Sequence, residues 1–474
     1  MGLAGIGLGL TVLSWLIWIG LIGFWGQFWR ADQRLEDRDG GLEIKGQAQA
    51  SPPPPSVCAI IPARNEADLL PTTVRSLLLQ TYPGQFSIIL VDDQSTDGTG
   101  EAAQQVAERI GQSARLTVIS GQPLPAGWTG KLWAMDQGIR QAQQRPSPPD
   151  YFLFTDADIE HSPANLQQLV TKAEQDHLDL VSLMVLLRCQ SCWEKLLIPA
   201  FVFFFQLLYP FPWVNDPAKK TAAAAGGCIL IRRQALERVG GLQVVRQALI
   251  DDCSLAAAVK SSGGDGGDGG DGGEDLETQH VASGTMRHKA GEKKIQNPKS
   301  KIQNPKSKIQ NPKSKIQNPK SKIQNPSFST PPTGKIWLGL TQSTRSLRSY
   351  PSLQIIWDMV ARTAYTQLGY SPLLLLGTVL GILLVYLAAP AATVWGVVSS
   401  NWGLAIAGLA GWLLMAWAYW PTLRLYRCSP LLAFCLPAIA FLYTLMTLDS
   451  ALRYWRGQGG AWKGRVYAEV RSQK

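Results

Sequence analysis

The chain has 474 residues, of which 46% are hydrophobic, and a formal net charge of +10 at pH 7. Ten lysines between Lys293 and Lys322 match this whole excess and lie in one repetitive segment, which argues against a nucleic-acid-binding protein. The seven cysteines are scattered and odd in number, which argues against a disulfide framework and indicates a reducing compartment.

The N-terminal segment is predicted to be an uncleaved membrane anchor. Residues 3–29 contain no charged side chain, and about 20 apolar residues suffice to cross a bilayer. A secretory signal peptide is the alternative, but the segment lacks a basic start and a small-residue cleavage site. The Pro-rich residues 47–56 then predict a stiff, extended linker.

After this linker, short apolar runs alternate with helical patterns. The runs that predict strands are residues 57–61, 86–91, 116–119 and 151–154, and helical spacing is found at residues 66–80 and 101–110. This alternation predicts an α/β fold, in which a mainly parallel sheet carries helices on both faces. Ligands of such sheets bind at the carboxyl ends of the strands.

Residues 261–333 interrupt the α/β pattern. Gly-Gly-Asp repeats come first, and five copies of Ile-Gln-Asn-Pro follow at a seven-residue spacing, starting at Ile295. A proline in every copy forbids a continuous helix, and the segment holds too few apolar residues to form a core. We therefore expect a disordered insertion in a surface loop.

Three later apolar stretches, residues 372–398, 402–423 and 430–448, are long enough to span a membrane. Residues 196–214 are shorter and rich in aromatic side chains. A buried core helix is one interpretation of this segment; a helix lying on the membrane surface is the other, and the aromatic density favours it.

Acidic residues stand where the expected strands end. Asp92-Asp93 follows one strand and Asp156-Ala-Asp158 another, while Asp251-Asp252 precedes a predicted helix. Carboxylates in such places often only cap helices. In this order and spacing they also suit group transfer from a diphosphate, which needs a general base for the acceptor and positive charge for the leaving group.

One-residue spacing lets Asp156 and Asp158 reach one divalent cation, Mg²⁺ or Mn²⁺. Arg345 and Arg348 precede the membrane region and could steady phosphate charge. His161 is expected to be a solvated loop residue, and no Ser/His/Asp arrangement is legible among the four histidines.

These motifs together resemble glycosyltransferase family 2, which has the GT-A fold. The resemblance rests on Ile60-Ile-Pro-Ala-Arg-Asn-Glu66, Val91-Asp-Asp-Gln-Ser-Thr-Asp-Gly98, Asp156-Ala-Asp158 and Asp251-Asp252. Further segments are similar to the hopene-associated glycosyltransferases of bacterial hopanoid clusters, namely residues 125–133, 197–206, 213–216, 221–228 and 361–368.

The resemblance implies a role for each matching residue. Pro62, Glu66 and Asp93 would line the nucleoside pocket, with Asp92 beside them. Lys131 would approach the diphosphate or the base, and Asp156 and Asp158 would hold the metal. Asp252 would be the catalytic base with Asp251 beside it, and Gly226 and Gly227 would lie under the acceptor.

Some of these residues have simpler interpretations. Gly226-Gly227 is also compatible with a plain tight turn, and Lys131 with a surface charge at a helix start. The family's Gln-x-x-Arg-Trp motif is incomplete, because Ser346 follows Gln342-Ser-Thr-Arg345 in place of Trp. An alternative alignment of the motif places its arginine at Arg348, in Arg345-Ser-Leu-Arg348. This departure weakens a link to processive polysaccharide synthases.

We therefore expect an inverting glycosyltransferase that moves a sugar from a nucleotide-sugar to a hopanoid or polyprenyl lipid. A nucleotidyltransferase on a related fold and a non-catalytic nucleotide-binding membrane scaffold are the alternatives. We expect a multi-pass protein of the inner (plasma) membrane, with its catalytic domain facing the cytoplasm. Three full C-terminal crossings would then leave the basic tail outside, so we expect the last stretch, with Pro437, to be re-entrant or a hairpin.

The expected domain organisation follows from these assignments. It consists of an N-terminal anchor (1–30), a charged and Pro-rich linker (31–56), a catalytic GT-A domain (57–260), the insertion (261–333), the end of the catalytic domain with an interfacial helix (334–371), a membrane region (372–450) and a basic tail (451–474).

Overall fold

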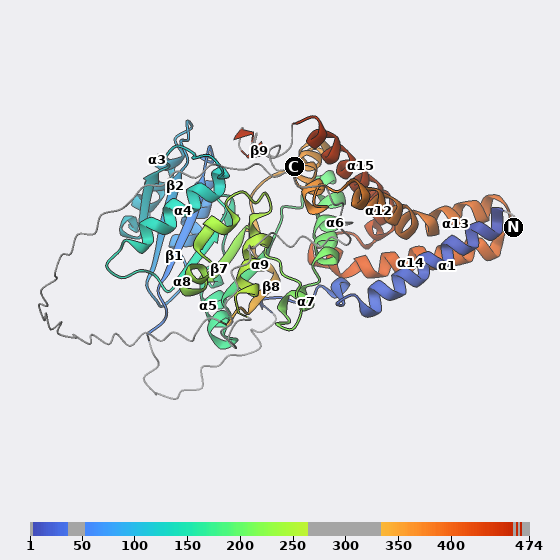
Figure 1. Cartoon of the computed structure of the whole chain (residues 1–474), viewed down its shortest axis with the longest axis horizontal. Helices are drawn as coiled ribbons and strands as arrows, with labels where there is room; N and C mark the ends of the chain where they lie inside the picture. The colour runs from blue at the N-terminus through green and yellow to red at the C-terminus, as the bar shows by residue number, and fades with distance from the viewer. Residues whose placement is uncertain (1–2, 37–52, 264–332, 458–460, 463–464, 467–474) are drawn as a thin grey trace, which may run out of the picture. The chain divides into compact units, whose positions relative to one another are not determined.

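The computed structural model describes residues 3–36, 53–263, 333–457, 461–462 and 465–466. The predicted insertion, the middle of the linker and most of the basic tail lie outside these described residues. An eight-stranded sheet, of which β1, β2, β7 and β8 are labelled in Figure 1, forms the centre of the catalytic part. Its strand order is β3-β2-β1-β4-β7-β6-β8-β5. The strands are β1 Val57–Ala63, β2 Phe86–Asp92, β3 Leu116–Ser120, β4 Tyr151–Thr155, β5 Ile159–Glu160, β6 Leu180–Leu186, β7 Cys228–Arg232 and β8 Ile336–Ser346.

The four predicted strands are confirmed as β1 to β4, and they pair in parallel. Strand β7 runs antiparallel to its neighbours β4 and β6, and β6 pairs in parallel with β8, so the sheet is mixed but mainly parallel. Every residue of β1, β4 and β7 is buried, as expected for central strands covered on both faces.

Helices cover both faces of this sheet, as predicted. One face packs α2 (Leu70–Leu78), α3 (Thr99–Arg109) and α5 (Asn165–Gln175), and the other packs α4 (Gly130–Gln143), α9 (Asp251–Ser261) and part of α6 (Cys192–Leu208). Shorter helical elements complete the domain: η1 Phe28–Arg30, η3 Ser113–Arg115, α7 Phe211–Asn215, α8 Arg233–Arg238 and η4 Gly241–Val245.

The C-terminal part is helical. Its elements are α10 Leu353–Ala361, α11 Ala364–Gln367, α12 Pro372–Ile382, η5 Leu383–Leu387, α13 Ala388–Val398, α14 Trp402–Leu425, η6 Pro430–Cys435 and α15 Leu436–Trp455. Together with α1 (Leu3–Phe24), and counting only residues that the structure describes, they give four segments long and apolar enough to cross a membrane: Gly5–Phe24, Pro372–Val398, Trp402–Leu425 and Pro430–Trp455. Helices α1, α13 and α14 pack side by side (Figure 1).

The expectation that residues 196–214 lie on a membrane surface is wrong. Helix α6 is packed inside the protein, with its two sides in different cores. Ile198 and Val202 belong to the core of the sheet, while Leu197 and Phe203 pack with α14 and α15. Phe203 contacts Tyr419 of α14 at a ring-centroid distance of 5.1 Å. The aromatic density therefore serves packing between helices.

The last apolar stretch, η6 and α15, is held by contacts near both of its ends. Cys428, before η6, lies with its sulfur 3.6 Å from that of Cys189 in the catalytic domain. Phe434 then contacts Trp412, near the middle of α14. Arg453, near the end of α15, pairs with Asp358 of α10 at 2.7 Å. Pro437 lies in the first turn of α15, directly after the 3-10 helix η6, at a position where proline is tolerated. The expectation that this stretch is re-entrant or a hairpin stays a prediction.

This path predicts that the C-terminus lies on the same side of the membrane as the catalytic domain. A cytoplasmic reporter fused at Lys474 should be active, while a fusion in the α13–α14 loop at Ser400 should read the opposite side, because α13 and α14 form an antiparallel pair. Reporter activity from the far side at Lys474 would mean that residues 430–455 cross completely.

The two ends of the predicted insertion meet. An ideal Cβ atom placed on Gly263 would lie 2.5 Å from the Cα atom of Gly334. Replacing residues 264–332 with two glycines should therefore keep the fold, with a melting temperature within about 3 °C of the wild type. Thermal unfolding in detergent and turnover would measure this; loss of either would show that the segment contributes to the catalytic part.

Candidate active site

The parallel strands bring the acidic motifs to one edge of the sheet. Ala63 at the end of β1 pairs in register with Asp92 at the end of β2, and β4 beside them ends at Thr155. The loops that follow carry Glu66, Asp93 and the Asp156-Ala-Asp158 motif. The sheet therefore gathers residues that are far apart in the sequence at the edge where ligands of such folds bind.

Asp252 reaches this edge from the start of α9. One of its carboxylate oxygens accepts a hydrogen bond of 2.8 Å from the backbone N–H of Gly226, and the other accepts one of 2.8 Å from the N–H of Cys253. Burial and then the charge of Asp251 raise the pKa of Asp252 to about 6, although Lys131 and the two backbone hydrogen bonds act against the rise. A carboxylate of this pKa is mostly ionised at neutral pH and is suited to accept a proton.

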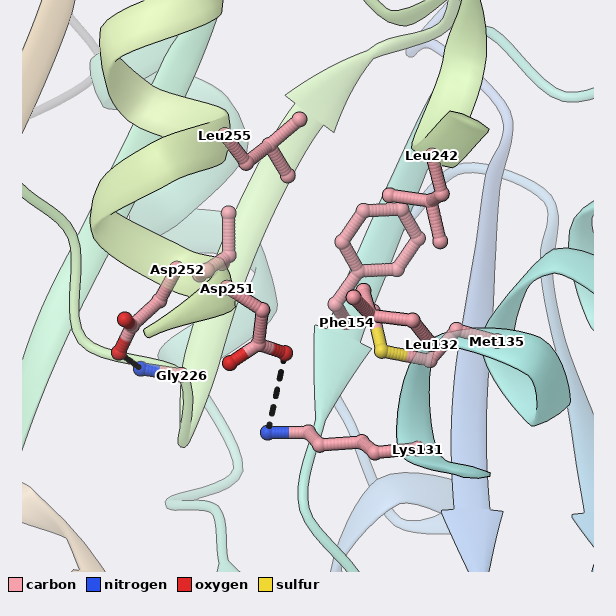
Figure 2. Close-up of a pocket in the computed structure, with 10 residues that line it drawn as sticks. Lys131, Leu132, Met135, Phe154, Gly226, Leu242, Asp251, Asp252 and Leu255 are labelled. Carbon is pink, nitrogen blue, oxygen red and sulfur yellow. Dashed lines mark hydrogen bonds and ion pairs between the residues drawn. The ribbon is translucent and has the colours of Figure 1, made fainter. Parts of the chain in front are cut away.

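Lys131 lies among three aspartates. Its Nζ atom is 2.8 Å from Asp156 Oδ1. The same atom is 3.8 Å from Asp251 Oδ2 (Figure 2). Burial alone would lower the pKa of Lys131, but the charges of Asp156, Asp251 and Asp252 raise it overall. The ammonium group therefore stays charged and offsets the repulsion between these carboxylates.

The polar groups meet an apolar wall in one pocket (Figure 2). Lys131, Gly226, Asp251 and Asp252 form its polar side. The remaining lining residues are all apolar: Leu132, Met135, Phe154, Ile229, Leu242 and Leu255. The charged groups thus lie directly beside apolar side chains at this edge of the sheet.

Arg348 joins two further carboxylates at this edge. Its Nε atom lies 2.7 Å from Asp158 Oδ2, and its Nη2 atom lies 2.6 Å from Glu66 Oε1. Burial raises the pKa of the Asp158 carboxyl, the charge of Asp156 adds to the rise, and Arg348 acts against it. The arginine of the incomplete Gln-x-x-Arg-Trp motif that reaches the acidic residues is therefore Arg348, which belongs to the alternative alignment of that motif.

Asp156 and Asp158 fit a divalent cation. They offer hard oxygen donors, and each already faces a positive group, Lys131 or Arg348. Within the described ranges, no cluster of three or more His, Cys, Asp or Glu side chains could hold a metal by itself. Phosphate oxygens and water would therefore complete the coordination, as is usual for Mg²⁺.

The residues of the predicted nucleoside pocket lie near each other. Pro62 is buried within β1, and Asp93 is buried directly after β2. Arg64, which the sequence reasoning did not single out, donates a 2.6 Å hydrogen bond to the backbone oxygen of Asp93. Asp92 instead caps the following turn, because its Oδ1 accepts a hydrogen bond from the N–H of Ser95 at 2.9 Å.

The two glycines have different surroundings. A Cβ atom on Gly226 would lie 3.2 Å from Lys131 Nζ and 3.3 Å from Asp252 Oδ2, so this position borders the charged groups directly. A Cβ atom on Gly227 would instead meet Val185 at 3.1 Å and Ile159 at 3.4 Å. Gly227 therefore permits close packing, and Gly226 leaves space in the pocket.

Two expectations differ from the structure. Arg345 is not brought to the acidic cluster: its side chain is 61% exposed and pairs with Glu160 at 2.7 Å. His161 is not solvated but buried, between the Thr155 hydroxyl at 2.9 Å and the Asn165 amide at 3.0 Å. Burial lowers the pKa of His161 to about 3, so it acts as a neutral packing residue.

Tyr209, which the sequence reasoning did not single out, connects the pocket with the helices near the membrane segments. It follows α6, and its hydroxyl donates to the Gln367 side chain of α11 at 2.8 Å. Burial raises the pKa of Tyr209, and the neighbouring Cys253 and Asp252 are further influences on it. An aromatic residue just after a buried helix carries no sequence signal that distinguishes it from the other aromatic residues of this segment.

Comparisons with known proteins point to one family. Residues 58–240 match the family model described as Glycosyl transferase family 2. The undecaprenyl-phosphate 4-deoxy-4-formamido-L-arabinose transferase of Pseudomonas savastanoi pv. phaseolicola is 31% identical over 141 residues, which are 29% of this chain and 38% of that protein. The uncharacterized glycosyltransferase EpsJ of Bacillus subtilis is 35% identical over 127 residues, 27% of this chain and 33% of that protein.

The chain thus spans well under half the length of these curated relatives. Among solved structures, the mannosyltransferase PcManGT from Pyrobaculum calidifontis in complex with GDP-Man and Mn²⁺ is similar with a TM-score of 0.36 and 21% identity, covering 54% of this chain and 64% of that one. The family match and the mainly parallel sheet with helices on both faces confirm the predicted GT-A type fold.

The raised pKa of Asp252 predicts a pH-dependent cost in stability. The unfolded chain ionises this carboxyl near pH 3.8 and the folded chain near 6, so the native state loses stability as pH rises between them. Asp252→Asn removes this cost, so its melting temperature relative to wild type should increase from pH 4 to pH 7. If the substitution only removed a hydrogen bond, it would shift the melting temperature by the same amount at every pH. A difference in melting temperature between variant and wild type that stays flat or decreases from pH 4 to pH 7 would contradict the raised pKa of Asp252.

Proposed function

We propose that this chain, which carries a family 2 glycosyltransferase domain, is a membrane-bound enzyme that transfers a sugar from a nucleotide-sugar to a lipid acceptor. The observation that carries the proposal is Asp252, a buried carboxylate with a raised pKa that borders a pocket at the ligand-binding edge of the sheet. The family match over residues 58–240 supports the reaction class.

In the proposed reaction Asp252 takes the proton from the acceptor hydroxyl or phosphate, and the acceptor oxygen attacks the anomeric carbon from the side opposite the diphosphate. This single displacement inverts the configuration at that carbon. The carbon–oxygen bond to the diphosphate breaks, and nucleoside diphosphate leaves. The two backbone N–H groups that bind Asp252 fix the direction of its carboxylate.

The donor is proposed to lie along the edge of the sheet from Pro62 and Asp93 toward Lys131. Lys131 and Arg348 are the cations nearest the acidic motif and would hold the departing diphosphate, while Glu66 and Asp92 belong to the nucleoside end. Arg345, which is mostly exposed, has no assigned role in this arrangement. A divalent cation held by Asp156 and Asp158 would neutralise charge on the leaving group when bound.

The acceptor is proposed to come from the bilayer, with the catalytic domain facing the cytoplasm at the inner (plasma) membrane. Helix α6 supports this, because one side packs in the sheet core and the other against the candidate membrane helices. Tyr209 then links the end of α6 to the start of α9, where Asp252 lies. A polyprenyl phosphate, named for one relative, and a hopanoid, implied by the resemblance, are the two acceptor classes proposed.

The test is release of nucleoside diphosphate by detergent-purified protein given UDP- or GDP-sugars, Mg²⁺ or Mn²⁺ and membrane lipid extract. Wild type should release it in a lipid-dependent way. Asp252→Asn should lower turnover by about 10² to 10⁴-fold, because general-base catalysis contributes that much, while nucleotide binding stays intact.

Arg345→Gln is the matched control. Arg345 is mostly exposed and pairs with the partly buried Glu160, so this variant should leave turnover unchanged. Normal turnover by Asp252→Asn would remove Asp252 from the role of base. Release of pyrophosphate would indicate a nucleotidyltransferase, and nucleotide binding without any release would indicate a scaffold.

A further inference from the structure

Both aspartates of the Asp156-Ala-Asp158 motif are held by cations of the chain itself. Lys131 Nζ lies 2.8 Å from Asp156, and Arg348 Nε lies 2.7 Å from Asp158. Ion pairs this short use carboxylate oxygens that would otherwise be available to a metal ion or to water. Positive charge thus already occupies the position where the proposed reaction requires a divalent cation.

Arg348 differs from Lys131 in what it connects. Its guanidinium reaches Asp158 with one nitrogen and Glu66 with another, at 2.7 and 2.6 Å, and so joins the proposed cation site to the proposed nucleoside pocket. The side chains of Asp158 and Glu66 are each 9% exposed, whereas that of Arg348 is 35% exposed. Burial of the two carboxylates makes them depend on a positive partner, and exposure gives Arg348 room to move.

The backbone on either side of Arg348 is anchored independently of its side chain. The N–H of Leu347 donates to the backbone oxygen of Asp158 at 2.8 Å. The N–H of Tyr350 donates to Glu194 at 2.7 Å, and the Ser349 hydroxyl bonds to Arg188. The guanidinium can therefore leave Asp158 by side-chain rotation while the segment keeps its position.

We propose that Arg348 is the resident counter-cation of the donor-free site, which a divalent cation and the donor diphosphate displace from Asp158 and Glu66. The proposal rests on the proposed function, since it needs a diphosphate donor at this edge. Two cations on one carboxylate repel each other, so the guanidinium and the divalent cation exclude each other at Asp158. Once released, Arg348 faces the diphosphate. It is a positioning residue that couples occupancy of the nucleoside pocket to that of the cation site.

Lys131 is not expected to exchange in this way. It is surrounded by Asp156, Asp251 and Asp252, so release from one of them leaves it held by the others. Arg348 instead pairs with Glu66 and Asp158, and both belong to the donor side of the proposed site. The exchange is therefore assigned to Arg348.

The experiment measures Mn²⁺ binding to the donor-free, detergent-purified full chain by the electron paramagnetic resonance signal of free Mn²⁺. Arg348→Gln removes the competing charge and should bind Mn²⁺ at least about fivefold more tightly than wild type, a typical size for coupling between sites. Arg345→Gln, which removes the same charge from a mostly exposed side chain in the same motif, should bind like wild type. Added UDP or GDP should tighten Mn²⁺ binding in wild type more than in Arg348→Gln.

Weaker or unchanged Mn²⁺ binding by a folded Arg348→Gln would overturn the exchange, because damage to the site lowers affinity while loss of a competitor raises it. If that variant does not fold, Arg348→Lys keeps one positive group and should give an affinity between wild type and twofold tighter; a weaker affinity would overturn the exchange. Absence of Mn²⁺ binding in every form would overturn it too, while lipid-dependent nucleoside diphosphate release would leave the transferase assignment standing. If Arg348→Gln binds Mn²⁺ more tightly but wild type releases no nucleoside diphosphate, the exchange at Arg348 stands and the proposed transferase activity is contradicted.

Discussion

The site depends on a balance of charge at the carboxyl edge of the sheet. Asp156, Asp158, Asp251 and Asp252 come from two separate parts of the chain, and unbalanced they would repel each other in a partly buried place. Lys131 and Arg348, from α4 and from the segment after β8, provide the opposing charge. The strand order brings these elements together, and Arg348 and Lys131 oppose the rise in the pKa of Asp158 and Asp252 that burial causes.

Helix α6 connects this charged edge to the candidate membrane helices. Its two apolar sides bury in two different cores, which fixes the catalytic domain against α14 and α15. Its capping box fixes the start of the helix: Ser191 accepts from Glu194, and the fully buried Glu194 also accepts from the N–H of Tyr350, close to Arg348. The position of Arg348 is thus tied to the same helix that Tyr209 follows, and Tyr209 in turn neighbours Cys253 and Asp252.

The strands and the acidic motifs were predictable because buried strands have a strong apolar pattern and each motif follows one directly. What packs against an apolar face was not predictable. Residues 196–214 show the same aromatic density whether lipid or another helix covers them, and the structure places α14 and α15 there. His161 shows the same limit, since only the packed structure reveals that Thr155 and Asn165 enclose it. The choice between Arg345 and Arg348 needed β8, which extends to Ser346 and leaves Arg345 exposed beside Glu160.

The central claim is that a lipid from the bilayer receives the sugar at Asp252. The most direct measurement follows a radiolabelled sugar from its nucleotide donor, with membrane lipid extract present, into the organic phase of a solvent extraction. Wild type should move the label into the organic phase with stoichiometric release of nucleoside diphosphate, and Asp252→Asn should leave it in the aqueous phase. Label that stays aqueous in wild type while nucleoside diphosphate is released would contradict a lipid acceptor.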